Sequence, residues 1–231
     1  MPTPHIGRGI AVTLIAVVLA WMTYRTLGAR PPATPNSDMP KVAADAPLAA
    51  TKSTQYAVFA GGCFWGTQAV FEHLKGVTSV TAGYSGGFVK DPSYDVVSLG
   101  FTEHAESVRV AFDPSEISYG KLLMVYFSVA HDPTQYNRQG PDYGSQYRSA
   151  IFYSSAEEKR IAESYVAQLT AAKIYSRPIV TEIKPFDAFY PAENYHQDYL
   201  KTHLDSPYIV MNDLPKLDQL KQRFPDLYRA N

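Results

Sequence analysis

The hydrophobic pattern of the chain changes from that of a strand to that of a helix between residues 56 and 74. Residues 56–60 form a short, continuous apolar run, which predicts a strand buried on both faces. The apolar positions of residues 64–74 then recur at helical spacing, and Gly76 is a typical stop signal. A strand over residues 77–82 follows. Cys63 is therefore expected at a turn between a strand and the start of a helix.

Residues 105–112 alternate between apolar and polar positions, which is typical of a half-buried strand. Extending this period toward the start of the strand places Glu106 on the same face as Val108 and Val110. A carboxylate on an apolar face is desolvated, so its pKa is expected to rise. The alternative is that Glu106, near the first position of the strand, points to water or pairs with Arg109.

The rest of the chain predicts further elements around a long polar loop. Apolar residues at helical spacing, with capping residues, predict helices at 118–130, 155–172 and 213–224. Apolar or alternating runs predict strands at 148–153 and 179–184. The loop of residues 131–147 holds almost no aliphatic side chains, and loops this long are usually functional or disordered. The order of elements predicts an α+β fold, a two-layer α/β sandwich with a ferredoxin-like core. Helices would pack on a mixed sheet, and long loops would gather over its Cys63 end.

The N-terminal region has the pattern of an export or anchoring segment. Residues 10–24 form an uncharged apolar run, with Arg8 before it and Arg25 after it. Its length lies between the core of a signal peptide and the roughly 20 residues of a membrane span. We therefore predict a signal peptide or membrane anchor over residues 1–30. Export or anchoring by residues 6–29 would place the remaining chain outside the cytoplasm, in the periplasm or cell envelope.

Beyond this segment, the composition indicates one globular domain preceded by a polar stretch. Residues 31–54 are rich in Pro, Ala, Ser, Thr and Asp without an apolar period, which predicts a flexible linker. Residues 55–231 would form the globular domain, including a C-terminal helical extension. The formal net charge of −1 gives no sign of a nucleic-acid partner. We expect the domain to be a monomer.

The only cysteine of the chain stands in the hexapeptide Gly61-Gly62-Cys63-Phe64-Trp65-Gly66, so no internal disulfide can form. At the N-terminus of a helix, unsatisfied N–H groups and the helix dipole favour a thiolate. A free cysteine is more often a small buried hydrophobe. Two glycines before the cysteine and two aromatic residues after it instead indicate a reactive sulfur beside an aromatic pocket.

This hexapeptide resembles the signature of the A-type peptide methionine sulfoxide reductases, and further stretches similar to that family follow in order. They are Gly83-Tyr84-Ser85-Gly86-Gly87, Pro92-Ser93-Tyr94, His104-Ala105-Glu106, Asp113-Pro114, His131-Asp132-Pro133-Thr134-Gln135, Arg138-Gln139-Gly140, Asp142-Tyr143-Gly144-Ser145-Gln146-Tyr147-Arg148-Ser149 and Tyr195-His196-Gln197. The resemblance implies a single-cysteine enzyme that reduces methionine S-sulfoxide, free or in proteins, to methionine. Such a reaction repairs oxidative damage.

The resemblance also implies which residues carry the reaction. Cys63 would attack the sulfoxide sulfur and become a sulfenic acid. Glu106 would act as the acid, because its protonated form can donate to the sulfoxide oxygen. The hydroxyl groups of Tyr94 and Tyr147 would bind the same oxygen.

The remaining implied residues bind the substrate. Phe64 and Trp65 would hold its terminal methyl group, Asp142 would contact it, and His196 would line the site. Many family members carry further cysteines near the C-terminus, and this chain has none. The resemblance therefore implies no bound cofactor or metal and an external thiol reductant, either a thioredoxin-like protein or a small thiol.

Two other classes of function remain open from the residues alone, and metal chemistry is a weaker third. A cysteine hydrolase would pair Cys63 with a histidine base, for which His104, His131 and His196 are candidates. A tyrosine-rich peptide-binding module would need no nucleophile. The spacing His104-x-Glu106 resembles half of a zinc deaminase signature, but the paired cysteines that complete such a site are missing.

Overall fold

The computed structural model describes residues 39–230, which belong to one compact unit. The predicted signal peptide or anchor over residues 1–30 lies outside the described residues. Within the part of the chain that is described, no helix has the length and the apolar character that a membrane span requires.

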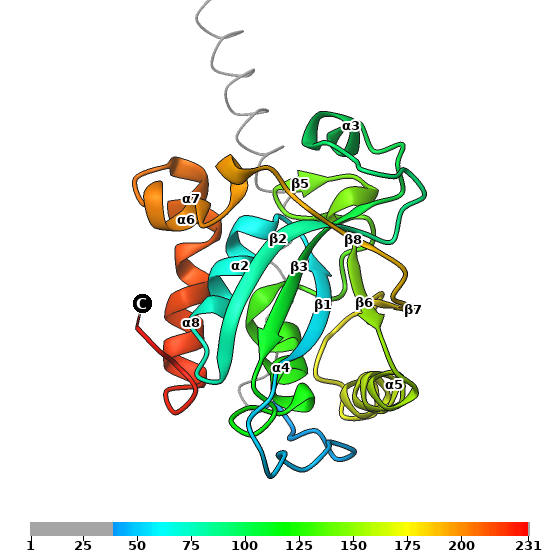
Figure 1. Cartoon of the computed structure of the whole chain (residues 1–231), viewed down its shortest axis with the longest axis vertical. Helices are drawn as coiled ribbons and strands as arrows, with labels where there is room; N and C mark the ends of the chain where they lie inside the picture. Colours follow the sequence, from blue (N-terminus) through cyan, green and yellow to red (C-terminus); the bar gives the residue numbers. More distant parts are fainter. Residues whose placement is uncertain (1–38, 231) are drawn as a thin grey trace, which may run out of the picture. The chain divides into compact units, whose positions relative to one another are not determined.

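A six-stranded sheet forms the centre of the unit, in the order β7-β6-β1-β3-β2-β8 (Figure 1). Its strands are β1 (Gln55–Gly61), β2 (Val77–Ser85), β3 (Ala105–Phe112), β6 (Ser149–Tyr153), β7 (Glu182–Pro185) and β8 (Phe189–Pro191). Neighbouring strands are antiparallel except β6 and β7, so the sheet is mixed, as the sequence predicted. Strand β7 lies at an edge of the sheet. A separate hairpin, β4 (Arg138–Gln139) and β5 (Asp142–Tyr143), stands in the long polar loop.

The helices and turns connect these strands. They are α2 (Phe64–Glu72), α3 (Tyr94–Ser98), α4 (Tyr119–Val125), the π-helical η1 (Tyr126–Ala130), the 3-10 turn η2 (Ser145–Tyr147), α5 (Ala156–Ala171), the 3-10 turn η3 (Asn194–His196), α6 (Tyr199–Thr202), α7 (Pro207–Asn212) and α8 (Leu214–Arg223). The succession β1-α2-β2-β3-α4-β6, with the strand order β6-β1-β3-β2, is the predicted ferredoxin-like core. Strand β1 runs toward the end of the sheet where α3 and β5 lie (Figure 1).

The main hydrophobic core lies between one face of the sheet and helices α2, α4, α5 and α8. Phe59 of β1 stacks on Phe71 of α2 and on Tyr126 of η1, with ring centroids 5.2 and 5.0 Å apart. Each fully buried aromatic side chain of this kind contributes about 3 kcal/mol or more to stability. The start of α2 is thereby fixed against β1, which orients the turn that carries Cys63.

A smaller core covers the other face of the sheet, so the prediction of a half-buried β3 was wrong. Phe186 and Phe189, which lie after β7, pack on this second face. Only Arg109 of β3 remains partly exposed, and its guanidinium lies 4.9 Å from the centroid of the Phe189 ring. Arg109 is therefore held by aromatic rings on this face and does not pair with Glu106.

Strand β2 runs three residues beyond the predicted range of 77–82. Gly83 to Ser85 remain in the strand because β8 pairs with them on the far side from β3. The hydroxyl group of Ser85 donates to the carbonyl of Ala188 at 2.6 Å, which fixes the approach to β8. The loop that carries Tyr94 therefore starts later than predicted.

The part of the predicted linker (residues 31–54) that the structure describes is bound to the folded domain. Asp45 accepts hydrogen bonds from the hydroxyl of Ser118 at 2.5 Å and from the backbone N–H of Gly120 at 2.9 Å. Further hydrogen bonds join residues 40–44 to the side chains of α5. Met39, Val42 and Ala46 also pack against the main core, so hydrogen bonds and a few apolar contacts hold this stretch in place.

Candidate active site

The turn between β1 and α2 has the geometry that the hexapeptide predicts. Cys63 is the N-cap residue of α2, and Gly62 before it has φ +83°. A side chain at Gly62 would come within 2.5 Å of Gln139, so both the left-handed backbone and the crowding require glycine. The hydroxyl group of Thr67 closes the turn by donating to the carbonyls of Gly61 and Cys63, both at 3.3 Å.

A cavity of about 200 Å³ opens beside Cys63. It is lined by Cys63, Phe64, Trp65, Tyr94, Glu106, Asp142, Tyr147 and Tyr208. Seven of these eight are residues that the sequence analysis predicted for the site, and they come from β1–α2, α3, β3, β5 and η2. Tyr208 was not predicted, and the predicted His196 is not among the lining residues.

Glu106 is buried at the start of β3 and is only 3% exposed. Its Oε2 accepts a hydrogen bond from the backbone N–H of Phe64 at 3.0 Å, which ties β3 to the first turn of α2. Burial raises the pKa of Glu106 to about 8, the charge of Asp142 adds to the rise, and the Phe64 N–H opposes it. Glu106 is therefore a proton donor near neutral pH.

Two tyrosines face this acid from short elements. Tyr94 begins α3, and its backbone N–H donates to Glu193 Oε1 at 2.8 Å. Glu193 also accepts from the hydroxyl of Tyr84 in β2 at 2.9 Å, so it ties α3 to the sheet. Burial, followed by the charge of Glu106, raises the pKa of both Tyr94 and Tyr147. Both hydroxyl groups therefore stay protonated and can donate.

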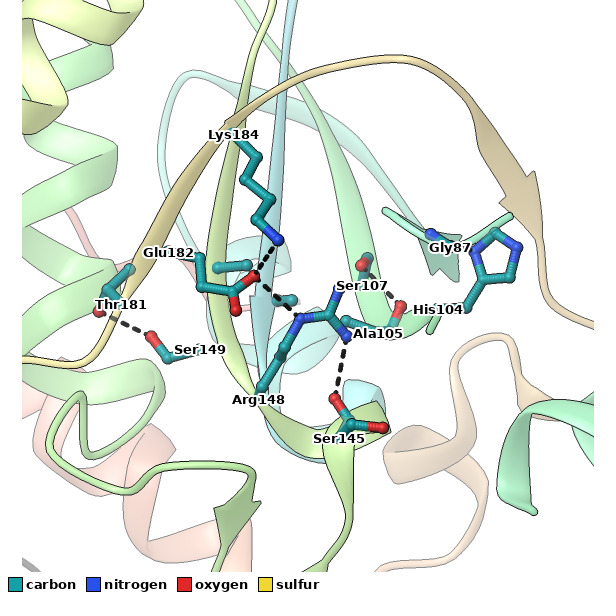
Figure 2. A network of polar contacts seen from close by, with 12 residues as sticks. Gly87, His104, Ala105, Ser107, Ser145, Arg148, Ser149, Thr181, Glu182 and Lys184 are labelled. Atoms are coloured by element: carbon teal, nitrogen blue, oxygen red, sulfur yellow. Dashed lines mark hydrogen bonds and ion pairs between the residues drawn. The ribbon is translucent and has the colours of Figure 1, made fainter. Parts of the chain in front are cut away.

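Arg148 holds the turn η2 that ends in Tyr147. Its Nη1 donates to the carbonyl of Ser145 at 3.0 Å, and its Nε donates to Glu182 Oε2 at 3.2 Å. Lys184 Nζ lies 3.0 Å from the same carboxylate oxygen. Figure 2 shows Arg148 between Glu182 and Ser145, which links the edge strand β7 to the turn.

An aromatic stack supports one wall of the cavity. Trp65 stacks on Tyr199, with centroids 3.8 Å apart and planes 10° apart. The Nε1–H of Trp65 donates to Nδ1 of His196 at 3.1 Å, and His196 is only 3% exposed. Burial lowers the pKa of His196, which suits a neutral, accepting ring. His196 is not itself a lining residue, but its ring contacts the lining rings of Phe64, Trp65 and Tyr94, so its part in the site stays a prediction.

Tyr208 at the start of α7 completes the cavity by donating its hydroxyl hydrogen bond to Asp142 Oδ2. Burial raises the pKa of Asp142, although this hydrogen bond opposes the rise. The helix start Ser206-Pro207, with proline at the first helical position, was the available sequence signal for a residue at this place. The contact between Tyr208 and β5 forms only in the folded chain, so no local sequence pattern predicts it.

The Cys63 thiol is not in the ionised form that the sequence predicted. Cys63 is 9% exposed, and burial raises its pKa well above the ordinary value, with the charges of Glu106 and Asp213 adding to the rise. The backbone N–H of Trp65 and the cation of Lys216 oppose the rise. The helix N-terminus acts in the predicted direction, but desolvation outweighs it, so the resting thiol is protonated.

The other candidate bases are engaged elsewhere. His104 accepts from the backbone N–H of Gly87 at 3.2 Å and contacts the carbonyl of Val89 at 2.7 Å. His131 bonds to the hydroxyl of Ser149 at 2.6 Å. Neither histidine lines the cavity. Within residues 39–230, no three His, Cys, Asp or Glu side chains are arranged to hold a metal ion.

Fold and cavity together bring a neutral acid and hydroxyl donors to a cysteine beside an aromatic wall, an arrangement typical of an enzyme site. The sequence model of the peptide methionine sulfoxide reductase family matches residues 55–227. The chain therefore belongs to the A-type peptide methionine sulfoxide reductases, oxidoreductases that reduce methionine sulfoxide to methionine.

Curated relatives and solved structures agree with this family. Peptide methionine sulfoxide reductase MsrA 2 of Mesorhizobium japonicum is 57% identical over 179 residues, which cover 78% of this chain and 92% of the relative. MsrA of Thermus thermophilus is 48% identical, over 76% of this chain and 98% of the relative. Reduced Mxr1 of Saccharomyces cerevisiae has a TM-score of 0.61 and 31% identity, over 69% of this chain and 94% of its own. Methionine sulfoxide reductase A of Corynebacterium diphtheriae has a TM-score of 0.57 and 33% identity, over 77% and 87%.

Proposed function

We propose that Cys63 is the nucleophile of this reductase and Glu106 its acid. The observation that carries the proposal is the single small cavity that brings Cys63, Glu106, Tyr94 and Tyr147 together. The sulfoxide oxygen is a strong hydrogen-bond acceptor. A protonated carboxyl and two protonated tyrosine hydroxyls are the donors that such an oxygen requires.

The reaction proceeds from the neutral thiol and the neutral acid. Glu106 gives its proton to the sulfoxide oxygen, and the resulting carboxylate takes the thiol proton as the Cys63 sulfur attacks the substrate sulfur. An S–S bond forms between Cys63 and the substrate, and Glu106, protonated again by the thiol, releases the substrate oxygen as water. Water then attacks the Cys63 sulfur, the S–S bond breaks with its electrons going to the substrate sulfur, and Glu106 takes back a proton. The products are methionine and a sulfenic acid on Cys63. The substrate sulfur is reduced by two electrons to methionine, and the cysteine sulfur is oxidised by two.

The aromatic wall selects the substrate's geometry. Phe64 and Trp65 contact its methyl group through apolar and sulfur–aromatic interactions. The aromatic wall, the hydroxyl and carboxyl donors and the Cys63 sulfur offer separate partners to the methyl group, the oxygen and the sulfur of the substrate, which fixes the hand of the chiral sulfur. Asp142, held by Tyr208, contacts the backbone or amine of the substrate. Reduction of one epimer, the S-sulfoxide, follows.

The sulfenic acid is reduced by an external thiol. The chain contains one cysteine, so no second thiol of the same chain can form a disulfide with Cys63. A first thiolate displaces hydroxide from the Cys63 sulfur to form a mixed disulfide, and a second thiolate releases the enzyme thiol. The reductant is a thioredoxin-like protein or a small thiol.

We further propose that residues 6–29 export or anchor the enzyme. The support is the sequence pattern, an uncharged apolar run between arginines. Cell fractionation of the tagged full chain, compared with a chain lacking residues 1–30, tests this proposal. The full chain is expected in the periplasmic or membrane fraction, and recovery of both chains in the cytosol would contradict it.

The catalytic proposal is tested by turnover with separated epimers of a methionine sulfoxide peptide and dithiothreitol as the only reductant. We expect reduction of the S-epimer by the wild-type chain and none by Cys63→Ser. Equal reduction of both epimers would contradict the fixed geometry. Surviving activity in Cys63→Ser would contradict the role of the thiol.

A further inference from the structure

A buried ion pair from the start of α8 packs against the first turn of α2, whose N-cap residue is Cys63. Asp213 is 1% exposed, and Lys216 Nζ lies 3.1 Å from its Oδ1. A methyl group added to Gly66 would overlap the Asp213 carboxylate and come within 2.8 Å of Lys216 Nζ. The glycine that ends the hexapeptide therefore leaves room for a charged pair.

This position brings the pair close to the sulfur. Gly66 follows Cys63 by three residues, and side chains at this spacing on a helix are neighbours, with Cβ atoms about 5–6 Å apart. Charges at such a distance interact appreciably at the effective dielectric constant of a protein. Asp213 and Lys216 can therefore influence the ionisation of Cys63 without entering the substrate cavity.

Helix capping does not explain the aspartate. Asp213 precedes α8, where an aspartate side chain ordinarily accepts from a backbone N–H of the first turn. Here it makes no such hydrogen bond and instead turns toward Lys216 and α2. Among the described residues, its Oδ2 has no hydrogen-bond partner. A buried, incompletely paired carboxylate costs stability, which points to a role beyond folding.

We propose that Asp213 and Lys216 are positioning residues that set how readily Cys63 ionises, Asp213 holding the thiol protonated and Lys216 favouring the thiolate. The inference rests on the proposed role of Cys63 as nucleophile. Consistent with it, Asp213 adds to the raised pKa of Cys63 and Lys216 opposes the rise. The other titratable groups around Cys63 are Glu106 of β3, Tyr94 of α3, Asp142 of β5, Tyr147 of η2 and Tyr208 of α7.

Such a balance suits an enzyme with one cysteine. A thiolate reacts with peroxide, and a sulfenic acid that cannot form an internal disulfide is open to further, irreversible oxidation. The thiol is safer when it stays protonated between turnovers. The positive charge of Lys216 limits the rise in the pKa of the Cys63 thiol, so that the sulfur can still react.

The test is the alkylation rate of Cys63 by iodoacetamide in the full chain as a function of pH, without substrate. Cys63 is the only thiol, so every adduct reports on it. We expect Asp213→Asn to react about tenfold faster near neutral pH and Lys216→Met about tenfold slower, since one pKa unit changes the thiolate fraction tenfold. The double variant should return near the wild-type rate. Lys216→Arg should keep that rate, as should Lys221→Met, a control on the exposed face of α8.

A purely structural role would move both single variants in the same direction, and that result, or equal rates in all variants, would overturn the inference. If Asp213→Asn does not fold, the comparison of Lys216→Met with Lys216→Arg decides, because only loss of the charge should slow alkylation. Alkylation needs no sulfoxide. If neither the wild type nor any variant released methionine, the proposed function would be contradicted. The alkylation result would still decide how Asp213 and Lys216 affect Cys63.

Discussion

At the scale of single residues, Glu106 and Cys63 share one buried environment, and burial favours the neutral form of both. The two effects support each other. When Glu106 carries its proton, its negative charge no longer opposes ionisation of the Cys63 thiol. The acid form that donates to the sulfoxide oxygen is thus also the form that lets the sulfur become nucleophilic.

The pH dependence of kcat/KM tests this arrangement. The raised pKa of Glu106, about 8, means that the acid form is complete at lower pH and is lost as the pH rises through that value. We expect wild-type kcat/KM to fall above about pH 8. Glu106→Gln should be slower by about a hundredfold or more and should lack this fall, because its amide does not titrate.

The matched control is Glu163→Gln on the exposed surface of α5, which should keep the wild-type profile. A Glu106→Gln chain with the same falling limb as the wild type would show that another group titrates there. Near wild-type activity of Glu106→Gln would remove it from the reaction.

Residues that follow a local pattern could be predicted from the sequence. Alternation along residues 105–112 placed Glu106 on an apolar face, and the change of period placed Cys63 at a helix start. The protonation of Cys63 was predicted wrongly because it depends first on burial in the folded chain and then on the charges of Glu106 and Asp213, which come from distant parts of the chain. Tyr208 was missed for the same reason, since its contact with Asp142 exists only after folding.

At the scale of elements, the hydroxyl donors stand on pieces too short to be stable alone. Helix α3 has five residues and η2 has three, well below the length at which an isolated helix forms in water. A charged side chain ties each of them to the sheet, Glu193 for α3 and Arg148 for η2, and Gln146 of η2 donates to the Ser98 carbonyl of α3. The sequence predicted a functional loop at 131–147 but not these supports, because their partners lie in later strands and turns.

Removing the support of η2 should therefore impair catalysis. Arg148→Met removes the side-chain donor that joins the Ser145 carbonyl to Glu182, and we expect a stability loss of about 1–3 kcal/mol. We also expect kcat to fall at least about tenfold, because Tyr147 is no longer held against the sulfoxide oxygen. Denaturant unfolding and steady-state kinetics measure the two effects.

Lys184→Met is the matched control, since Lys184 pairs with the same Glu182 oxygen but does not reach the turn. It should leave kcat unchanged. Unchanged kcat in Arg148→Met would show that Tyr147 does not depend on this arginine.

At the scale of the whole molecule, the docked stretch before β1 extends the folded unit beyond the predicted start at residue 55. It lies against α4 and α5, whereas the cavity is built from other elements. A regular hydrophobic period could not reveal it, because Asp45 and backbone carbonyls make many of the contacts and only Met39, Val42 and Ala46 pack on the core. The α+β class and the ferredoxin-like core could be predicted, since the order of periods along the chain reflects them directly.

Asp45→Ala should separate stability from activity. It removes the acceptor for the Ser118 hydroxyl and the Gly120 N–H, and we expect a loss of about 1–2 kcal/mol in the free energy of unfolding. The kcat should remain that of the wild type. Asp205→Ala, at an exposed position, should change neither quantity. A large fall in kcat without a loss of stability in Asp45→Ala would connect this stretch to the site.

The central claim is that one buried cysteine takes the oxygen of methionine sulfoxide without any second thiol. The most direct measurement mixes the purified chain with methionine sulfoxide in the absence of reductant, traps sulfenic acid with dimedone and reads the intact mass. The account predicts one dimedone adduct on Cys63 and one equivalent of methionine released per chain. No adduct and a thiol that is still free to titrate would contradict it and would make Cys63 a packing residue.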